Sequence, residues 1–289
     1  MPSVKDLRER IRSLKNTQQI TKAMKQVAAA KIRRAEQAQK EARPYADTLG
    51  EMLQDLMAAV SSVDHPFMKA GNAGAPPGVV LMTADKGLAG AFNSNVIRAG
   101  ELYAREHKDV AWYTVGIKAR NAVRRMGQAE RPTWAINVPS KLDVAREVAQ
   151  RVSDDFVNGK ISEIVLISSK LISMLSQKPE VRQLVPITRE DIATTDKTTA
   201  PKGAVEFAPS PEFVLSRLLP KYVEFTIFSA ILETDAAFFA AQLVAMNNAT
   251  ENAGKLIDEL TIQMNNARQA AITKELLEIV GGAEALVKG

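Results

Sequence analysis

Residues 4–14 read VKDLRERIRSL, and this stretch decides how the beginning of the chain folds. Its apolar residues recur at spacings of three, four and three, at Val4, Leu7, Ile11 and Leu14. Such spacings put an apolar side chain on one face at every turn, as in the seam of a coiled coil. After a register shift through residues 16–19, we expect the stripe to resume at Ile20, Met24 and Val27.

The same segment carries the signals of a long helix. Ser3 is a suitable N-cap, and Asp6 lies where a negative charge favours the helix start. No Gly or Pro follows until Pro44, where we expect a kink or a break. If helical throughout, residues 3–58 would extend roughly 80 Å at ~1.5 Å per residue.

The end of the chain has the same character. Ser210 is a suitable N-cap and Pro211 a suitable first helical residue, and before Gly281 and Gly282 only Pro220 and Gly254 interrupt the pattern. One seam consists of Ala253, Ile257, Leu260, Met264, Ala267 and Ala271. A second, offset seam consists of Ile272, Leu276, Ile279, Ala283 and Leu286. We therefore expect residues 1–60 and 208–289 to pair as a long antiparallel coiled coil.

The middle of the chain alternates short apolar runs with helical patterns, which predicts an α/β unit with a largely parallel sheet. Strands are expected at 79–82, 110–115, 133–138, 164–167 and 182–187, and helices at 93–107, 117–126 and 141–158. The predicted fold is thus mixed α+β and α/β: a Rossmann-like α/β domain at 75–190 inserted into the coiled coil. Residues 188–206 are polar and are expected to form a mobile loop.

Composition excludes several kinds of chemistry. The 289 residues include no Cys, so a disulfide, a thiolate zinc site and a cysteine nucleophile are excluded. The two histidines, His65 and His107, offer no metal-binding spacing. The N-terminus lacks a secretory signal, and no stretch reaches the ~18 apolar residues of a membrane span, the longest run being 236–246. We expect no catalytic residue, no cofactor and no metal.

Positive charge is concentrated at the start of the chain. Residues 1–43 hold 12 Lys and Arg against 4 Asp and Glu, whereas the remainder holds 26 against 29. A basic helix suits nucleic acid, an anionic membrane or an acidic protein surface. Aromatic residues for base stacking are absent from it before Tyr45, so nucleic acid is the weaker alternative.

A glycine-containing loop follows the first expected strand and reads TADKGLAGAFN, residues 83–93. Gly87 and Gly90 would let backbone amides approach a phosphate. The loop lacks the first Gly of the dinucleotide motif, and Lys86 precedes the glycines instead of following them. A tight connection between strand and helix is the favoured interpretation, and a nucleotide site is the alternative.

Two long runs give the chain a family resemblance. NTQQITKAMKQVAAAKIRRAE at 16–36 and ARQAAITKELLEIVGGAEAL at 267–286 resemble the gamma subunit of F-type ATP synthases. Within the second run, the residues that match the C-terminal signature of the family are Ile272, Thr273, Glu275, Glu278, Gly282 and Ala283. The loop at 83–93, with Asp85, Lys86, Gly87 and Gly90, is similar to the family's central glycine motif.

The resemblance implies a non-catalytic rotating shaft. Such a shaft couples proton flow through a membrane c-ring to ATP synthesis or hydrolysis at catalytic beta subunits. The implied partners are the alpha and beta subunits, the epsilon subunit and the c-ring, with one copy per complex and no direct membrane insertion. The implied location is peripheral, on the cytoplasmic face of the bacterial inner membrane. A free-standing helical scaffold that binds an acidic partner or nucleic acid is the alternative.

The resemblance also assigns roles to residues. A basic track of Lys25, Lys31, Arg33 and Arg34 is expected to face an acidic loop of the beta subunit. Met24, in the same motif, is either a contact or a seam residue. Arg268, Gln269 and Thr273 match residues that hydrogen-bond a catch loop of the beta subunit. The segment Val205–Pro209 is expected near epsilon and the c-ring.

Overall fold

The computed structural model describes residues 3–59, 64–107, 109–128, 132–188, 208 and 210–287. The chain divides into two compact units, one of Met1–Ala28 with Leu243–Gly289 and one of Ala29–Gln242. We call the first the helix pair and the second the α/β unit. Two helices, α1 (Val4–Ala59) and α6 (Pro211–Val287), contribute residues to both.

Both long helices begin where the sequence predicts. The Asp6 amide donates to the Ser3 hydroxyl at 3.2 Å, and the Ser3 amide donates to the Asp6 carboxylate at 3.1 Å, a reciprocal cap. These hydrogen bonds from Ser3 lower the pKa of Asp6. At the start of α6, the Phe213 amide donates to the Ser210 hydroxyl at 3.3 Å.

The prolines do not end the helices, so of the kink or break expected at Pro44 the break is wrong, and the kink stays a prediction. Helix α1 continues through Pro44, and α6 continues through Pro220 and Gly254. A proline inside a helix costs roughly 3 kcal/mol, and burial of neighbouring side chains offsets that cost. Leu53 after Pro44, and Leu219 beside Pro220, are fully buried.

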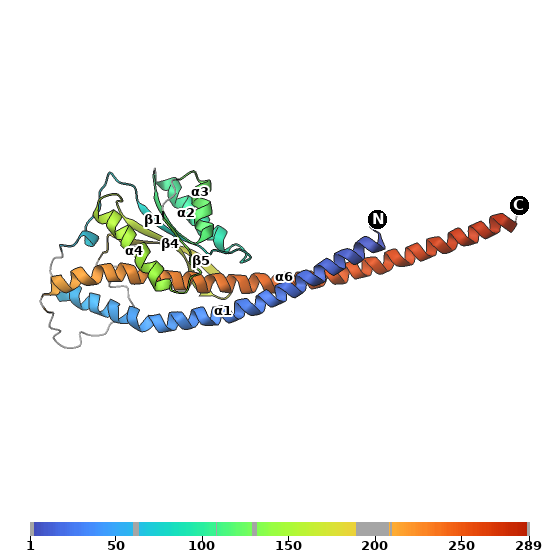
Figure 1. Ribbon diagram of the computed structural model, residues 1–289, viewed down its shortest axis with the longest axis horizontal. Helices are drawn as coiled ribbons and strands as arrows, with labels where there is room; N and C mark the ends of the chain where they lie inside the picture. The colour runs from blue at the N-terminus through green and yellow to red at the C-terminus, as the bar shows by residue number, and fades with distance from the viewer. Residues whose placement is uncertain are drawn as a thin grey trace. The chain divides into compact units, whose positions relative to one another are not determined.

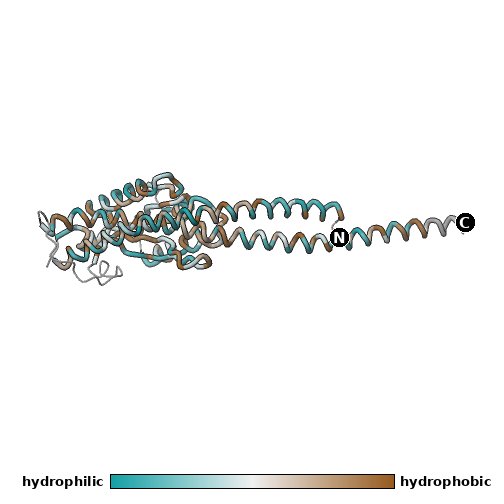
Figure 2. Tube along the Cα trace, turned by 90° about the horizontal axis from the view of Figure 1, so that it is seen from below, coloured by the Kyte–Doolittle hydropathy of each residue, from teal (hydrophilic) through white to brown (hydrophobic). Residues whose placement is uncertain are grey.

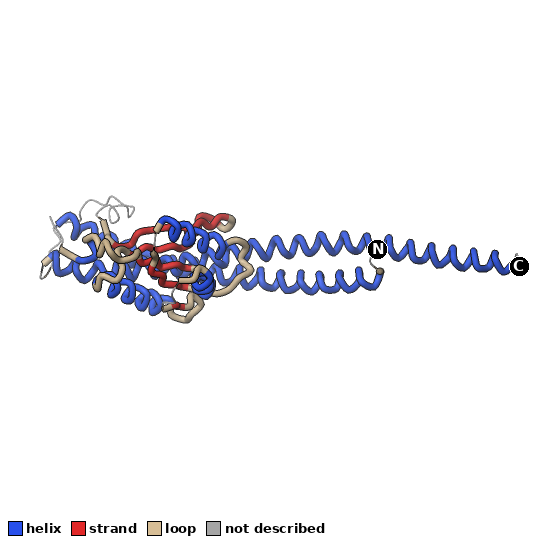
Figure 3. The backbone as a smooth tube through the Cα atoms, turned by 90° about the horizontal axis from the view of Figure 1, so that it is seen from above, coloured by secondary structure: helices blue, strands red, loops and turns tan. Residues whose placement is uncertain are grey.

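Hydrogen bonds between α1 and α6 fix the antiparallel register of the helix pair. The Gln18 amide donates to the Thr250 carbonyl at 3.4 Å, Thr250 donates to the Thr21 hydroxyl at 2.8 Å, and Lys25 donates to Asn247 at 2.6 Å. Figures 1 and 3 show the two helices side by side in this region. The buried positions on α1 therefore keep one continuous spacing through polar residues.

The register shift expected at residues 16–19 is wrong. The side chains of Gln18, Thr21 and Lys25 lie toward α6, whereas Ile20 and Val27 are 60% and 54% exposed. Only Met24 of the expected second stripe is partly buried. The polar residues replace apolar packing with hydrogen bonds across the pair, so apolar spacing alone misplaced the seam.

On α6, the first expected seam is confirmed over most of its length. Ala253 is buried, and partly buried residues recur after it at Ile257, Leu260, Met264 and Ala267. Ala271 and the second seam differ, because Ile272, Leu276 and Ile279 are at least half exposed. Figure 2 shows hydrophobic and hydrophilic residues alternating along this part of α6. These three residues of the second seam are therefore not packed in a core within the described chain.

The α/β unit contains one five-stranded sheet in the order β3-β2-β1-β4-β5. The strands are β1 (Gly78–Met82), β2 (Ala111–Val115), β3 (Thr133–Trp134), β4 (Ile164–Ser173) and β5 (Ser176–Val185). β3, β2, β1 and β4 are parallel, and β5 is antiparallel to β4. The predicted alternation and the Rossmann-like α/β insertion are confirmed. The last strand begins at Ser176, earlier than the expected 182, and the third ends at Trp134.

Helices cover both faces of the sheet, as Figure 1 shows. They are α2 (Phe92–Glu106), α3 (Ile117–Arg125) and α4 (Lys141–Val157). Side chains of α2 and α3 pack with Val79, Leu81 and Trp112 on one face. On the other face, α4 packs with Val80, Tyr113, the later part of α1 and the first part of α6. The short helix η1 (Pro66–Met68) joins this second core through Phe67.

Two further expectations need correction or stay open. The spacing of Leu142, Ala145, Val148, Val152 and Phe156 in the sequence predicts that all five lie on the buried face of α4. Leu142 is instead 40% exposed, because the buried face begins at Ala145. The loop at 188–206 lies outside the described residues apart from Thr188.

Helix α6 also contains an 18-residue window apolar enough to cross a membrane, with a mean hydropathy of 1.5. Within the protein, 67% of that window is buried. Counting uninterrupted apolar residues in the sequence missed this window, because a mean tolerates isolated polar residues. Its burial is typical of a core helix.

Candidate functional site: surfaces of the two long helices and the glycine loop

The glycine loop is held by its own polar side chains. The Asp85 carboxylate accepts hydrogen bonds from the backbone amides of Ile117 at 3.0 Å and Asn137 at 2.9 Å, with the Ile136 amide at 3.5 Å. Asn93 spans the loop, accepting from the Ala84 amide and donating to the Lys86 carbonyl, each at 3.0 Å. Asp85 therefore supplies the anion at the start of α3.

This geometry disfavours a nucleotide at the loop. The amide that begins α3 already binds a carboxylate, and a second anion there would be repelled. The hollow among Lys31, Lys86, Asp235 and Phe239 has a volume of about 20 Å³. That is room for roughly one water molecule. The loop is a strand-to-helix connection in which Leu88 has a φ of 62° and is 64% exposed.

The four residues of the basic track do not share one environment. Lys25 belongs to the helix pair and donates to Asn247. Lys31 belongs to the α/β unit, and its ammonium lies 5.0 Å from the centre of the Phe239 ring. Arg33 and Arg34 are exposed. Lys25 and Lys31 thus make contacts within the chain, and the two arginines are the more accessible charges.

The C-terminal residues lie on an exposed stretch of α6. Arg268, Gln269 and Thr273 are exposed, as are Glu275 and Glu278 of the signature. An ion pair between Lys274 and Glu278, at 3.6 Å, bridges one turn of this stretch. Gly282 and Ala283 lie within α6, but their surroundings are outside the described side chains. The stretch presents polar and apolar side chains together, as a surface that binds another protein would.

The pKa shifts of Asp155 and His65 follow from burial and from the groups around them. Asp155 is buried with the Tyr113 hydroxyl at 2.7 Å, Arg151 at 3.0 Å and Lys160 at 3.1 Å. Burial alone would raise the pKa of Asp155, but hydrogen bonds from Tyr113 and Lys160 and the charges of Arg151 and Lys160 lower it. Burial lowers the pKa of His65, whose Nδ1 accepts from the Phe67 amide. Over the described residues, no three His, Cys, Asp or Glu side chains form a metal-binding group.

Sequence reasoning missed two sets of contacts. The polar layers at Gln18, Thr21 and Lys25 follow the spacing of Val4, Leu7, Ile11 and Leu14, so continuing that count would have found them. The ion pairs Lys141–Asp235 and Arg146–Glu224 join residues far apart in the chain. No local pattern in the sequence signals these pairs.

Comparison with known proteins decides the family. The profile of the ATP synthase family matches residues 3–286. The chain is 44% identical over 293 residues to the ATP synthase gamma chain of Phenylobacterium zucineum, in a match that covers 99% of this chain and 100% of that one. It is 42% identical over 290 residues to the gamma chain of Heliobacterium modesticaldum, with the same coverage. The chain belongs to the ATP synthase gamma-chain family.

Solved structures agree with the fold of this gamma chain. The rotor of the Euglena gracilis mitochondrial ATP synthase in rotational state 1 is 20% identical, with a TM-score of 0.66 over 93% of this chain and 98% of that one. A chain of the OSCP/F1/c-ring assembly of the same synthase in rotational state 3 has a TM-score of 0.69 over 98% and 94% of the two chains, at 20% identity. The coiled coil with an inserted α/β domain is therefore shared across distant relatives. Gamma chains are subunits of the ATP synthase enzyme complex.

Proposed function

We propose that this gamma chain is the central rotor of a proton-translocating F-type ATP synthase. It couples proton flow through a c-ring to ATP synthesis or hydrolysis on catalytic beta subunits. The observation that carries the proposal is the match to bacterial gamma chains over 99% of the chain. The paired helices support it, because a shaft needs a long element whose stiffness comes from its own seam.

The chain itself performs no chemistry in this proposal. Asp85 fills the position in the glycine loop where a phosphate would be expected, and the adjacent hollow holds about 20 Å³. The chain needs no cofactor or metal of its own. Its contribution is mechanical, since an asymmetric shaft imposes different conformations on the subunits around it.

The proposed partners are the alpha and beta subunits, the epsilon subunit and the c-ring, with one gamma chain per complex. Two of the related structures comprise a central stalk with a c-ring and an OSCP/F1/c-ring assembly. The chain would lie peripherally on the cytoplasmic face of the bacterial inner membrane. In this arrangement residues 1–60 and 208–289 form the shaft, and 75–190 form the α/β domain. Val205–Pro209, proposed near epsilon and the c-ring, lies outside the described residues except Ala208.

Two surfaces are proposed to meet the beta subunits. Arg33 and Arg34, with Lys25 and Lys31 beside them in sequence, form the basic track toward an acidic loop. Exposed ion pairs contribute only ~0–1 kcal/mol each, so they suit a sliding contact better than a clamp. Arg268, Gln269 and Thr273 form the catch contact, and their exposure within this chain is compatible with that role.

Reconstitution tests the proposal. The purified chain should assemble with alpha, beta and epsilon subunits and restore rotation-linked ATPase activity, and the complete enzyme should pump protons. Copurification with nucleic acid, with a steep loss of binding as salt increases, would favour the scaffold alternative. Stoichiometric micromolar ATP binding to the isolated chain by calorimetry would overturn its non-catalytic role.

A further inference from the structure

Helix α4 lies between the sheet and α6. Its buried residues Ala145, Val148 and Val152 join a core that also contains Leu219, Val223 and Ile227 of α6. Apolar contact of this kind is strong but non-directional. It holds the helices together without fixing how far one slides or turns against the other.

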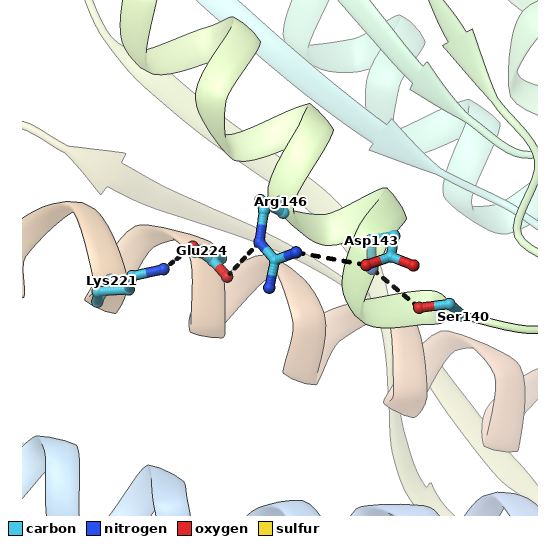
Figure 4. Close-up of polar contacts among 5 residues, drawn as sticks. All are labelled: Ser140, Asp143, Arg146, Lys221 and Glu224. Atoms are coloured by element: carbon cyan, nitrogen blue, oxygen red, sulfur yellow. Dashed lines mark hydrogen bonds and ion pairs between the residues drawn. The ribbon is translucent and has the colours of Figure 1, made fainter.

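Two ion pairs add direction to this contact. Lys141 pairs with Asp235, and both side chains are mostly buried, at 20% and 13% exposure. Arg146 lies 3.5 Å from Glu224, whose side chain is 14% exposed. Figure 4 shows the Arg146 guanidinium between Glu224 of α6 and Asp143 of α4, with Lys221 on the other side of Glu224. Both carboxylates of α6 are therefore shielded from water and held by cations of α4.

The spacing of the two pairs matters for how α6 is held. Glu224 and Asp235 are 11 residues apart, which is about three turns and about 16 Å along α6, on nearly the same face. Along α4 the order is reversed, since Lys141 precedes Arg146. With the apolar core holding the faces of the helices together, two contacts at separated points along α6 oppose both sliding and turning of α6 against α4, whereas one contact would act as a pivot.

We propose that Lys141–Asp235 and Arg146–Glu224 form a torsional lock that makes α6 and the sheet turn as one body. This inference rests on the proposed rotor function. The four residues are positioning residues: they touch no substrate, and they set the stiffness with which torque passes from α6 into the α/β domain. The lock lies entirely within the α/β unit.

Angular fluctuations of single molecules test the lock. The complete complex is attached to a surface through its alpha and beta subunits, and ATP turnover is stopped. A bead is then attached to the α/β domain through Leu102→Cys, on α2. The chain has no Cys of its own, and Leu102 is 50% exposed. The double variant Glu224→Gln, Asp235→Asn keeps the side-chain shapes and removes both charges. The variance of the bead angle should rise roughly twofold or more, because each cation loses its shielded partner.

The matched control is Glu180→Gln, which removes a charge from the Lys170–Glu180 pair between β4 and β5. It should leave the variance at the wild-type value. The exchange Lys141→Asp, Asp235→Lys, made with Glu224 intact, re-forms the ion pair with its charges reversed, so the variance of the bead angle should also stay at the wild-type value. If the variance depended only on folding stability, this exchange would not be expected to keep it there. Lower unfolding midpoints with an unchanged variance in Glu224→Gln, Asp235→Asn would overturn the lock. A wild-type chain that fails to assemble or rotate would overturn the rotor function instead.

Discussion

At the scale of single residues, Asp85 shows how a motif that resembles a ligand site serves the fold. Its carboxylate binds amides of α3 and of the segment before α4, so one side chain joins three parts of the α/β unit. Hydrogen bonds to a charged group contribute ~1.5–3 kcal/mol each, and the amides would lose their partner without it.

We predict that Asp85→Ala lowers the free energy of unfolding by about 3 kcal/mol. Urea denaturation of the purified chain measures the change. Lys86→Ala is the control, because the Lys86 side chain is exposed and the residue contributes to the loop through its backbone carbonyl. Equal stability of the two variants would mean that the amides find other partners.

Asp155 gives a prediction for pH. Its folded pKa is lowered from the ordinary value of 3.8, so the folded state holds the charged form more strongly than the unfolded state does. Its contribution to stability is therefore full above pH 3.8 and is lost as pH falls through the folded pKa. The stability difference between wild type and Asp155→Asn should be constant near neutral pH and shrink below pH 3.8. Denaturation at a series of pH values checks this, with exposed Asp154→Asn as the control; a difference that grows in acid would contradict the sign.

At the scale of elements, the sequence predicts the long helices and the order of the sheet well. Regular apolar spacing and the N-caps at Ser3 and Ser210 act on neighbouring residues only, so they can be recognised in the sequence and are present in the folded chain. The predicted break at Pro44 is wrong because the sequence shows the free-energy cost of a proline inside a helix but not the burial that offsets it. The burial of Leu53 depends on the whole fold. The sequence analysis places the start of β5 too late, because residues 176–182 are mostly polar, as is typical of an edge strand.

The surfaces are less predictable than the elements. Gln18, Thr21 and Lys25 look like a solvent-facing stretch until the partner helix is in place, and then Ile20 and Val27 become the exposed residues. Residues such as Arg268 and Gln269 are exposed in this chain, so their roles come from family resemblance and stay proposals. Ion pairs such as Lys141–Asp235 depend on tertiary contacts that no sequence spacing encodes.

The seam of α6 predicts the effect of a buried charge. Leu260 is partly buried in the helix pair, whereas Ile262, two residues on, is 62% exposed. Leu260→Lys should lower the stability of the helix pair by about 2 kcal/mol, because the ammonium must leave the seam or remain there unpaired. Ile262→Lys should leave stability within about 0.5 kcal/mol of wild type. Thermal unfolding followed by circular dichroism separates the two, and equal effects would show that the seam does not run through Leu260.

At the scale of the whole molecule, the described chain leaves one long surface without an internal partner. Ile272, Leu276 and Ile279 are at least half exposed on α6, next to the exposed polar side chains of Arg268 and Gln269. Exposed apolar side chains gathered on one element are typical of a binding surface. In the proposed rotor, that surface is completed only inside the ring of alpha and beta subunits. Substitutions on this surface should then affect turnover more than folding.

The catch residues provide the sharpest test of that expectation. Gln269 and Thr273 are four residues apart and share one face of α6, with Arg268 beside them. Arg supplies a planar set of donors, Gln a donor and an acceptor, and Thr a hydroxyl, which together suit a loop of carboxylates and carbonyls. Arg268→Leu with Gln269→Leu should lower steady-state ATPase activity and ATP-driven proton pumping while the complex still assembles.

The size of the effect follows from the chemistry of the contact. Hydrogen bonds to charged groups contribute ~1.5–3 kcal/mol, and water recovers part of that when they are lost. The control is Gln263→Leu, the same chemical change as Gln269→Leu on an exposed position of the same helix, about 120° around the helix from Gln269. Turnover of the purified, subunit-complete enzyme is the measurement. These side chains are exposed in the free chain. A wild-type rate in the double variant would therefore mean that they only face solvent and make no contact that matters for turnover. A rate lost together with assembly would assign them to docking and not to the rotary cycle.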